Sequence, residues 1–560
     1  MKVDAPAAAP FAGATHAVTN QPPPLVDFNA YEADRPLTEA VRREGAEWAE
    51  ARIFAAGAAG GSAEALEWGR EANENPPRLR THDRYGNRVD EVEFHPSWHR
   101  MLALEVEHAA HALPWLEPEP GAHVARAAIS ILLSHAEAGV GCPISMTYSS
   151  VPALRTQPEL AQEWEPRLLS TSYDSRPIAA EQKDGALCGM AMTEKQGGSD
   201  VRANTTVARP LNGGGPGAEY ALTGHKWFCS APMCDAFLVL AQAEDGLSCF
   251  LLPRFTPDGE RNAGFQLKRL KDKLGNRSNA SSEVEFHEAW ARMVGEPGRG
   301  VPTIIEMVNH TRLDCVLGST TGMRVGVEQA SWHAAHRSAF GAPLADQPLM
   351  QNVLADLAVE SEAATISALR LARAYDESHA GDPHAQRFKR LATAVLKYWI
   401  CKRAPSHAVE ALECLGGNGY VEDSGMPRLF RESPLNSIWE GSGNVQCLDV
   451  LRAMVKSPES VEAFFAELAE AEGAEPRLDA YVGELRAELA DLADAEARAR
   501  RLVERMALAL QGSLVVRFAD PAVADAFCAS RLAGDWGGAF GTLPASVDFR
   551  RIVERHLPAV

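Results

Sequence analysis

One carboxylate, Glu440, stands out in the stretch "IWEGSGNVQCLD" (438–449) because of its neighbours. Trp439 precedes it, and Gly441, Ser442 and Gly443 follow it. Glycines let a ligand approach the backbone because they lack a Cβ atom, and desolvation beside a bulky apolar side chain raises the pKa of a carboxyl group. The stretch is therefore typical of a general base. The alternative is an ordinary turn, in which Glu440 is solvated or caps the following helix.

The segment "MAMTEKQGGSD" (190–200) carries hydroxyl groups on both sides of a glycine pair. Thr193 and Ser199 can donate hydrogen bonds, and Gly197 and Gly198 leave backbone N–H groups accessible to a ligand. Such a set suits the polar edge of an aromatic ring or a diphosphate group. A surface turn without a ligand would use the same residue types.

A second segment, "GHKWFCSAP" (224–232), is typical of a strand that presents aromatic faces and one hydroxyl group, Ser230. The alternative is a half-buried strand in which Trp227 and Phe228 pack into the core. Histidine pairs in "HPSWH" (95–99) and "EHAAH" (107–111) could lie on shared helical faces, but no further ligands accompany them. We therefore expect no metal site.

Composition limits the classes of function. The 560 residues are 46% hydrophobic and 23% charged, which indicates a globular protein of several domains. A net charge of −20 opposes attraction to nucleic acid or an anionic membrane over the surface as a whole. The ten scattered cysteines indicate reduced thiols, and we find neither an apolar signal region nor a run of roughly 20 apolar residues. The sequence predicts a cytoplasmic protein.

Hydrophobic periodicity divides the chain into five segments that must position these residues. Residues 1–35, rich in Ala and Pro, predict an extended arm. Helical periodicity over 36–185 gives way to short alternating stretches over 186–298 and returns over 299–455, where a helix with a kink at Pro405 should end near Gly416. Residues 456–560 predict an Ala-rich, amphipathic pair of helices, the second over 481–510.

Four motifs, in this order, carry a resemblance to a known family: "TEKQGGSD", "GHKWFCSAP", "HRSAFGAPL" with "LECLGGNGY", and "IWEGSGN". Over roughly residues 60–455 the chain resembles the acyl-CoA dehydrogenase flavoproteins. It is most similar to the AidB branch (alkylation-response, isovaleryl-CoA dehydrogenase-like), which shares "KLGNRSNAS" and the appended helical segment.

The resemblance implies an α+β fold of the acyl-CoA dehydrogenase type. Its parts would be an N-terminal helical domain, a middle β-barrel domain, a C-terminal four-helix-type domain and an appended C-terminal helical domain. It also implies FAD as the cofactor and a homotetramer as the assembly.

The resemblance also implies roles for individual residues. Glu440 stands at the family's usual base position, where it would remove the α-proton of an acyl-CoA while flavin N5 accepts a hydride from Cβ. Thr311 stands where isovaleryl-type enzymes place their base. Arg337 and Phe340 would reach the FAD of a neighbouring subunit, although the glutamine of that motif comes one position early, at Gln347. The other residues expected to contact FAD are Met192, Thr193, Ser199, Phe228, Cys229, Ser230, Gly416, Gly417, Ile438, Trp439, Gly441, Ser442, Gly443 and Asn444.

Three functions are compatible with this sequence. The first is an FAD-dependent, AidB-like dehydrogenase that acts, with weak activity, on an acyl-CoA or a related small molecule. The second is a metabolic acyl-CoA dehydrogenase that donates electrons to an electron-transfer flavoprotein. The third is a flavoprotein that binds double-stranded DNA and protects it from alkylation without physiological turnover of acyl-CoA.

The charge of the appended segment bears on the third function. Residues 456–560 contain 12 Lys plus Arg and 18 Asp plus Glu, whereas nucleic-acid binding usually needs a basic surface. The interpretation favoured for its arginine clusters is a helix face in which they pair with nearby acids. The clusters are Arg498, Arg500, Arg501 and Arg505, and Arg550, Arg551 and Arg555.

Overall fold

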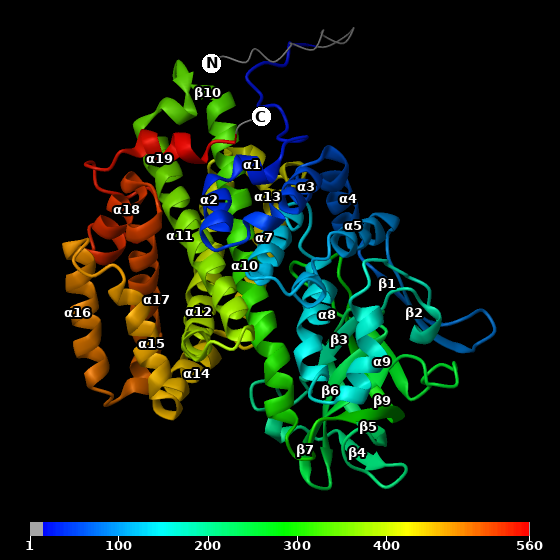
Figure 1. Cartoon of the computed structure of the whole chain (residues 1–560). Helices are drawn as coiled ribbons and strands as arrows, with labels where there is room; N and C mark the ends of the chain where they lie inside the picture. The colour runs from blue at the N-terminus through cyan, green and yellow to red at the C-terminus, as the bar shows by residue number, and fades with distance from the viewer. Residues whose placement is uncertain (1–14, 559–560) are drawn as a thin grey trace.

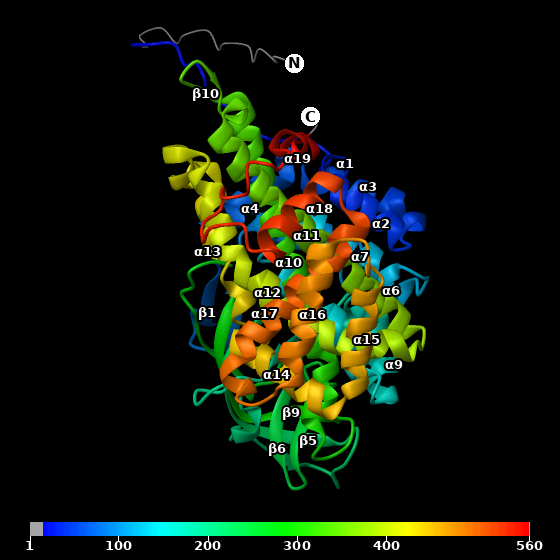
Figure 2. The ribbon, with the colours of Figure 1, turned by 90° about the vertical axis from the view of Figure 1, so that its left-hand side faces the viewer.

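Long helices form the centre of the molecule, and the other elements pack on either side of them (Figure 1). The computed structural model describes residues 15–558. The N-terminal helices and a β-barrel lie on one side of the central helices, and the appended helices lie on the other (Figures 1 and 2). The central helices are α10 (Gly300–His336), α11 (Pro348–His379) and α12 (Pro383–Glu413). The predicted fold class is confirmed.

The N-terminal part is helical apart from one hairpin, and its first helix begins at Ala30, inside the predicted arm. Asn29 caps this helix by accepting hydrogen bonds from two backbone N–H groups, and Asp34 caps the next helix. The helical periodicity predicted over 36–185 is interrupted near Gly45, where φ is +89°. The helices are α1 (Ala30–Ala33), α2 (Arg35–Arg43), α3 (Glu50–Gly60), α4 (Ala63–Glu74), α5 (Pro96–Glu107), α6 (Leu113–Leu116), α7 (Ala122–Leu133), α8 (Gly141–Leu154) and α9 (Pro158–Leu168).

The hairpin formed by β1 (Arg78–His82) and β2 (Arg88–Glu93) was not expected from the helical periodicity. The carboxylate of Asp83 organises its turn by accepting hydrogen bonds from two backbone N–H groups. Arg88 then donates to the carbonyl of Leu267 in the barrel at 2.6 Å. The hairpin therefore joins the helical part to the barrel.

Seven strands form the middle domain. Six of them are paired in the order β3-β6-β4-β5-β9-β7, and β8 also pairs with β9. Because β7 pairs with both β9 and β6, five of these strands close into a ring, which is the barrel. The strands are β3 (Cys188–Ala191), β4 (Val207–Pro210), β5 (Glu219–Ser230), β6 (Ala236–Ala243), β7 (Gly246–Pro253), β8 (Phe265–Leu270) and β9 (Ser281–Val294).

The central helices are followed by shorter elements. Pro405 lies inside α12, which continues as one helix to Glu413, and Gly416 adopts φ of +59° shortly after its end. The additional elements of this part are the hairpin strands β10 (Ser338–Ala339) and β11 (Ala342–Pro343), and helices α13 (Met426–Glu432) and α14 (Gly443–Lys456).

The appended part packs against α11, α12 and α14. The predicted helix over 481–510 is two helices, because the chain turns at Asp494 with φ of +53°. Glu467 links this part to the core by accepting hydrogen bonds from Arg370 on α11 and Arg517, each at 2.7 Å. The helices are α15 (Pro458–Ala469), α16 (Pro476–Ala490), α17 (Ala495–Phe518), α18 (Pro521–Phe527) and α19 (Phe549–His556).

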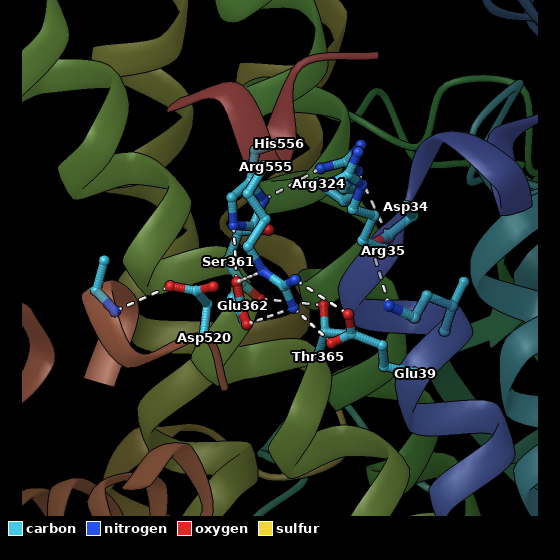
Figure 3. Close-up of polar contacts among 12 residues, drawn as sticks. Asp34, Arg35, Glu39, Arg324, Ser361, Glu362, Thr365, Asp520, Arg555 and His556 are labelled. Carbon is cyan, nitrogen blue, oxygen red and sulfur yellow. Dashed lines mark hydrogen bonds and ion pairs between the residues drawn. The ribbon is translucent and has the colours of Figure 1, made fainter. Parts of the chain in front are cut away.

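Helix α19 is fastened to the core by a buried polar network (Figure 3). The Glu362 carboxylate of α11 contacts Arg555 at 3.0 Å and His556 at 2.8 Å. Arg555 also pairs with Glu39 of α2 at 2.6 Å, and Arg324 of α10 donates to the carbonyl of Ala33 at 2.7 Å. The last helix is thereby joined to the first ones (Figure 3).

Three further observations concern the described residues as a whole. All ten cysteines are free thiols in buried positions. Within residues 15–558, no His, Cys, Asp and Glu side chains gather as a set of three or more metal ligands. No helix in that range has the length and apolar character needed to cross a membrane.

Candidate active site

A cavity of about 1300 Å³ lies between the N-terminal helices, the barrel, and one side of α10. Residues of α10 from Val301 to His333 contribute to its wall, so the cavity is elongated along that helix. The predicted site residues on its wall are Met192, Thr193, Ser199, Phe228, Ser230, Ile438, Trp439, Glu440, Gly441 and Ser442. The fold thus brings three motifs that are distant in sequence to one cavity.

Glu440 lies in the loop before α14 and has a left-handed backbone conformation. Its φ is +57°, and that of Gly441 is +95°. A non-glycine residue in this region costs free energy and persists only where surrounding contacts impose it. The backbone around Glu440 is therefore held by other parts of the structure.

Side chains from two central helices and from α14 hold this loop by its carbonyl oxygens. The buried Lys397 of α12 donates to the carbonyls of Trp439, at 2.7 Å, and Gly441. Arg312 of α10 and Gln446 of α14 donate to the carbonyl of Glu440 at 3.2 and 3.1 Å. Neither Lys397 nor Arg312 belongs to a motif that the sequence analysis singled out.

The carboxyl group of Glu440 is positioned by Thr311. The Thr311 hydroxyl donates to Glu440 Oε2 at 2.8 Å. Burial raises the pKa of Glu440 above its ordinary value, and the Thr311 hydrogen bond and the positive charges of Lys397 and Arg312 oppose this rise. The result is a carboxylate of increased basicity on a cavity wall, which suits proton abstraction.

The barrel contributes a second wall with exposed apolar surface and hydroxyl groups. Phe228 is 46% exposed, and Ile438 of the opposite loop is 62% exposed. Ser230 lies within hydrogen-bond distance of Ser281, with their hydroxyl oxygens 3.1 Å apart. Large exposed apolar side chains on a concave wall are typical of a ligand site.

A buried ion pair supports the glycine-containing loop at 190–200. Glu194 and Lys226 are both fully buried, and their charged groups are 2.8 Å apart. Glu194 also accepts hydrogen bonds from the N–H groups of Thr205 and Thr206. Its pKa is lowered because these contacts and Lys226 outweigh desolvation. Both residues stand in the quoted motifs, but their pairing was not anticipated.

Three predicted contacts lie off the cavity wall. Cys229 is buried, because alternation along β5 directs Phe228 and Ser230 to the cavity and Cys229 to the other face. Gly443 begins α14, and a Cβ atom added there would lie 3.4 Å from the Tyr398 ring. Asn444 is exposed and accepts a hydrogen bond from Arg500 at 2.8 Å.

The residues predicted to act across a subunit interface also lie outside the cavity. Arg337 donates to the backbone carbonyl of Asn20. Phe340 is 100% exposed, and a Cβ atom at Gly416 or Gly417 would meet no neighbour within 4 Å. Within this chain Phe340, Gly416 and Gly417 are open surface, whereas Arg337 is half-buried.

The predicted arm supplies part of the cavity wall, which the sequence analysis did not foresee. Its segment from Gln21 to Val26 lines the cavity. Trp332 of α10 donates to the carbonyl of Pro23 at 2.7 Å, and Asn20 exchanges two hydrogen bonds with Ser338. Residues 1–14 of the predicted arm lie outside the described residues.

Most members of the two arginine clusters have partners, as the favoured interpretation predicted. Arg501 and Arg505 pair with Glu488 at 2.8 and 3.2 Å, and Arg551 pairs with Asp520 at 2.8 Å. The Arg498 guanidinium donates to the backbone carbonyls of residues 491 and 493.

The walls of the cavity fit the predicted FAD. The exposed face of Phe228 can contact a flat ring, and the hydroxyl groups of Thr193, Ser199 and Ser230 can bond to its polar edge. Gly198 packs tightly, since a Cβ atom there would lie 2.4 Å from Oγ1 of Thr193. At Gly197 the backbone faces open space with φ of +146°, which leaves room for a ligand.

Comparison with known proteins identifies chains that are similar over most of the length of this one. Residues 20–175 match the model of the adaptive response protein AidB N-terminal domain. Residues 189–289 match the acyl-CoA dehydrogenase middle domain, and residues 298–455 match the acyl-CoA dehydrogenase C-terminal domain. The chain is 46% identical to AidB of Escherichia coli strain K12 over 516 residues, which cover 92% of this chain and 94% of that protein.

Solved structures show the same architecture. Caenorhabditis elegans ACDH-11, in complex with C11-CoA, superimposes with a TM-score of 0.83 at 29% identity and covers 93% of both chains. An acyl-CoA dehydrogenase from Bacillus anthracis, complexed with FAD, has a TM-score of 0.62 at 19% identity over 82% of both chains, which shows a common fold alone.

Proposed function

This chain belongs to the acyl-CoA dehydrogenase family, in its AidB group, and we propose that Glu440 serves it as the base that removes the α-proton of an acyl-CoA thioester. Members of the family are oxidoreductases that act on CH–CH groups and use FAD. The proposal concerns the residues and the substrate of this particular chain.

The observation that carries the proposal is the constrained carboxylate of Glu440. It lies on the wall of the large cavity, has a raised pKa, and is held by Thr311 at 2.8 Å. When bound, FAD would accept the hydride that leaves the β-carbon. The barrel residues Phe228 and Ser230 would hold the cofactor, and Glu440 would meet the thioester from the opposite loop.

The nature of the walls supports an acyl thioester as the ligand. Ile304, Ile305 and Val308 of α10 give the cavity an apolar side suited to an alkyl chain. The structural relative from Caenorhabditis elegans is complexed with C11-CoA. We propose that this chain takes an acyl-CoA of comparable chemical class.

Anaerobic titration of the purified holoprotein with a series of acyl-CoA esters, C11-CoA included, tests the function. We expect the flavin absorbance near its long-wavelength maximum to bleach with at least one ester. Bleaching that is fast and confined to one chain length would favour the metabolic alternative, with an electron-transfer flavoprotein as acceptor. Binding without any bleaching would contradict the dehydrogenase proposal.

We also propose that the chain forms a homotetramer in which the β10–β11 hairpin of one subunit reaches the FAD of another. Phe340 at the hairpin tip is fully exposed and has φ of +52°. Hairpin turns of this length normally place Gly, Asn or Asp at such a position, because a bulky side chain is strained there. A strained and exposed aromatic residue supports a contact with a second copy.

The third proposal is that the chain protects DNA. The resemblance to AidB favours it, whereas the net acidic appended part and its paired arginines disfavour it. Binding through this part would need those ion pairs to open.

A further inference from the structure

The wall of the cavity contains a buried carboxyl group without a hydrogen-bond partner. Glu105, in the last turn of α5, is 1% exposed and lines the cavity. Within residues 15–558 its side chain makes no hydrogen bond, and Oε1 is both buried and unpartnered. Buried polar groups are nearly always paired, so this group calls for a partner that the chain itself does not supply.

The charged groups nearest to Glu105 already form an ion pair with one another. Arg126 of α7 forms a two-pronged ion pair with Asp314 of α10, and its Nε donates to the carbonyl of Ala110 at 2.8 Å. The Tyr148 ring lies 3.8 Å from the guanidinium carbon. Three of the five N–H donors of Arg126 are used in these contacts, and within residues 15–558 no hydrogen bond joins Arg126 to Glu105.

A second unpartnered polar atom lies on the same helix face as Arg126. Ser130 follows Arg126 by four residues and also lines the cavity, and its hydroxyl group has no partner. The cavity wall also includes apolar side chains, among them Ile144 and Met146 on α8 and Val308 on α10, and further charged ones such as Lys273 and Arg428. Glu105 and Ser130 each present a buried polar atom without a hydrogen-bond partner within residues 15–558, and we call Glu105, Arg126, Ser130 and Asp314 the polar patch.

This patch lies close to the proposed base. Asp314 comes three residues after Thr311 on α10, so the two share a face and are separated by about 4.5 Å along the helix axis. Thr311 contacts Glu440, and Asp314 contacts Arg126. A ligand whose reacting carbons face Glu440 can thus extend along this wall.

The patch is electrically neutral near pH 7. The charges of Arg126 and Asp314 cancel, and burial raises the pKa of Glu105 to about 8, against the lowering effect of Arg126 and with smaller contributions from Glu137 and Asp314. A protonated carboxyl group both donates and accepts hydrogen bonds. Such a site favours an uncharged polar group over a carboxylate or an ammonium ion.

We propose that Glu105 and Ser130 form a specificity subsite that binds a hydroxyl or keto oxygen on the acyl chain of the substrate. The inference rests on the proposed function for the thioester end of the ligand. It assigns to this chain a class of oxygen-substituted acyl thioesters, in preference to plain acyl chains of the same length. Glu105 acts here in binding and takes no part in the proton transfer.

The test compares CoA esters of equal chain length that are plain, hydroxylated or keto-substituted, with the oxygen moved stepwise along the chain. Equilibrium affinity for the holoprotein and flavin bleaching are measured separately. We expect one oxygenated position to bind about tenfold more tightly than the plain ester, which is the effect of one hydrogen bond. Glu105→Gln should keep this preference, because an amide also donates and accepts, and Glu105→Met should abolish it.

Thermal unfolding separates this role from a structural one. Replacing an unpartnered buried carboxyl group by Met of similar size should leave Tm unchanged or raise it. A fall in Tm together with an unchanged ligand preference would overturn the inference. Glu107→Met, at an exposed position of the same helix, is the matched control.

The outcomes distinguish the subsite from the proposed function. Equal affinity for plain and oxygenated esters, with bleaching by both, would overturn the subsite and leave the dehydrogenase proposal intact. A second outcome is that oxygenated esters bind selectively, that Glu105→Met removes this selectivity, and that no ester bleaches the flavin. This outcome would support the subsite and contradict the dehydrogenase proposal. Failure of every CoA ester to bind would contradict both.

Discussion

The hydroxyl group of Thr311 donates a hydrogen bond to Oε2 of Glu440 at 2.8 Å, across 129 positions of sequence. The two residues occupy the two places where relatives were expected to carry a base, and here one supports the other. The contact favours the ionised form of Glu440, whereas burial favours the protonated form. Thr311 therefore adjusts the pH at which Glu440 becomes a competent base.

Thr311→Val should move the pH dependence of flavin reduction to higher pH. Reduction requires ionised Glu440, so its rate rises as pH passes the pKa of that residue. Loss of a hydrogen bond to the charged form raises this pKa further. The measurement is single-turnover bleaching across a pH series. Thr311→Ser, which keeps the hydroxyl group, should resemble the parent, and an unchanged profile in the Val variant would contradict the role given to Thr311.

Glu440→Gln tests the base itself. The substitution keeps the shape of the side chain and removes the proton acceptor, so flavin content and Tm should stay close to those of the parent. The rate of reduction by an active acyl-CoA should fall by at least about 10² to 10⁴. Stopped-flow absorbance under anaerobic conditions measures it. A Glu440→Gln protein that is reduced as fast as the parent would make Glu440 a turn residue only.

Phe340→Asn tests the subunit contact. Asn tolerates the positive φ of 52° at this position, so the hairpin should lose strain and Tm should not fall through local effects. Loss of the aromatic ring should nevertheless reduce the tetramer fraction and the FAD-to-protein ratio, as measured by light scattering and absorbance. Tyr85→Asn, which removes an exposed aromatic ring from the other hairpin, is the control. Unaltered assembly and flavin content would remove Phe340 from the interface.

Glu362 should make the attachment of α19 sensitive to acid. Burial alone would raise its pKa, but contacts with His556 and Arg555 outweigh burial and hold the pKa at about 2, below the ordinary value of 4.5. The carboxylate therefore stabilises the docked helix above pH 4.5, and this contribution is lost as the pH falls toward 2. The shift corresponds to about 3 kcal/mol.

Limited proteolysis across this pH range measures the release of α19. In the parent, cleavage before α19 should increase as the pH falls through the window. Glu362→Gln should be cleaved readily at neutral pH and show little further change with acid. Glu459→Gln, at an exposed position of α15, should behave like the parent. An equal response in all three proteins would contradict the role of Glu362.

The arginine clusters should contribute little to any binding of DNA. Arg501 and Arg505 pair with Glu488, so their charges are already compensated. We expect the combined change Arg501→Gln and Arg505→Gln to leave both the affinity for duplex DNA and its salt dependence unaltered. Fluorescence anisotropy in a salt series measures both. A smaller salt slope in the double variant would instead identify this cluster as a phosphate-binding surface.

The sequence by itself determined the classes of structure and their order. Helical and alternating periodicities arise from local backbone hydrogen bonding, so they could be read along the chain. The motif at 438–449 and the hydroxyl groups at Thr193, Ser199 and Ser230 were identified as candidates for one site, and all of these hydroxyl groups lie on the cavity wall. The interruption of the predicted helix at Asp494 was missed, because a single residue with positive φ hardly changes the hydrophobic periodicity of the sequence.

Only the tertiary structure decided which side chains converge. Because side chains alternate along β5, Cys229 points away from the cavity. Asn444 instead accepts a hydrogen bond from Arg500, which lies on a helix 56 positions later in the chain. Glu105 carries no motif, and its significance appears only because α5 and α7 place it beside the cavity without a partner. Contacts between residues far apart in the chain depend on the packing of whole helices and strands, which local sequence patterns do not encode.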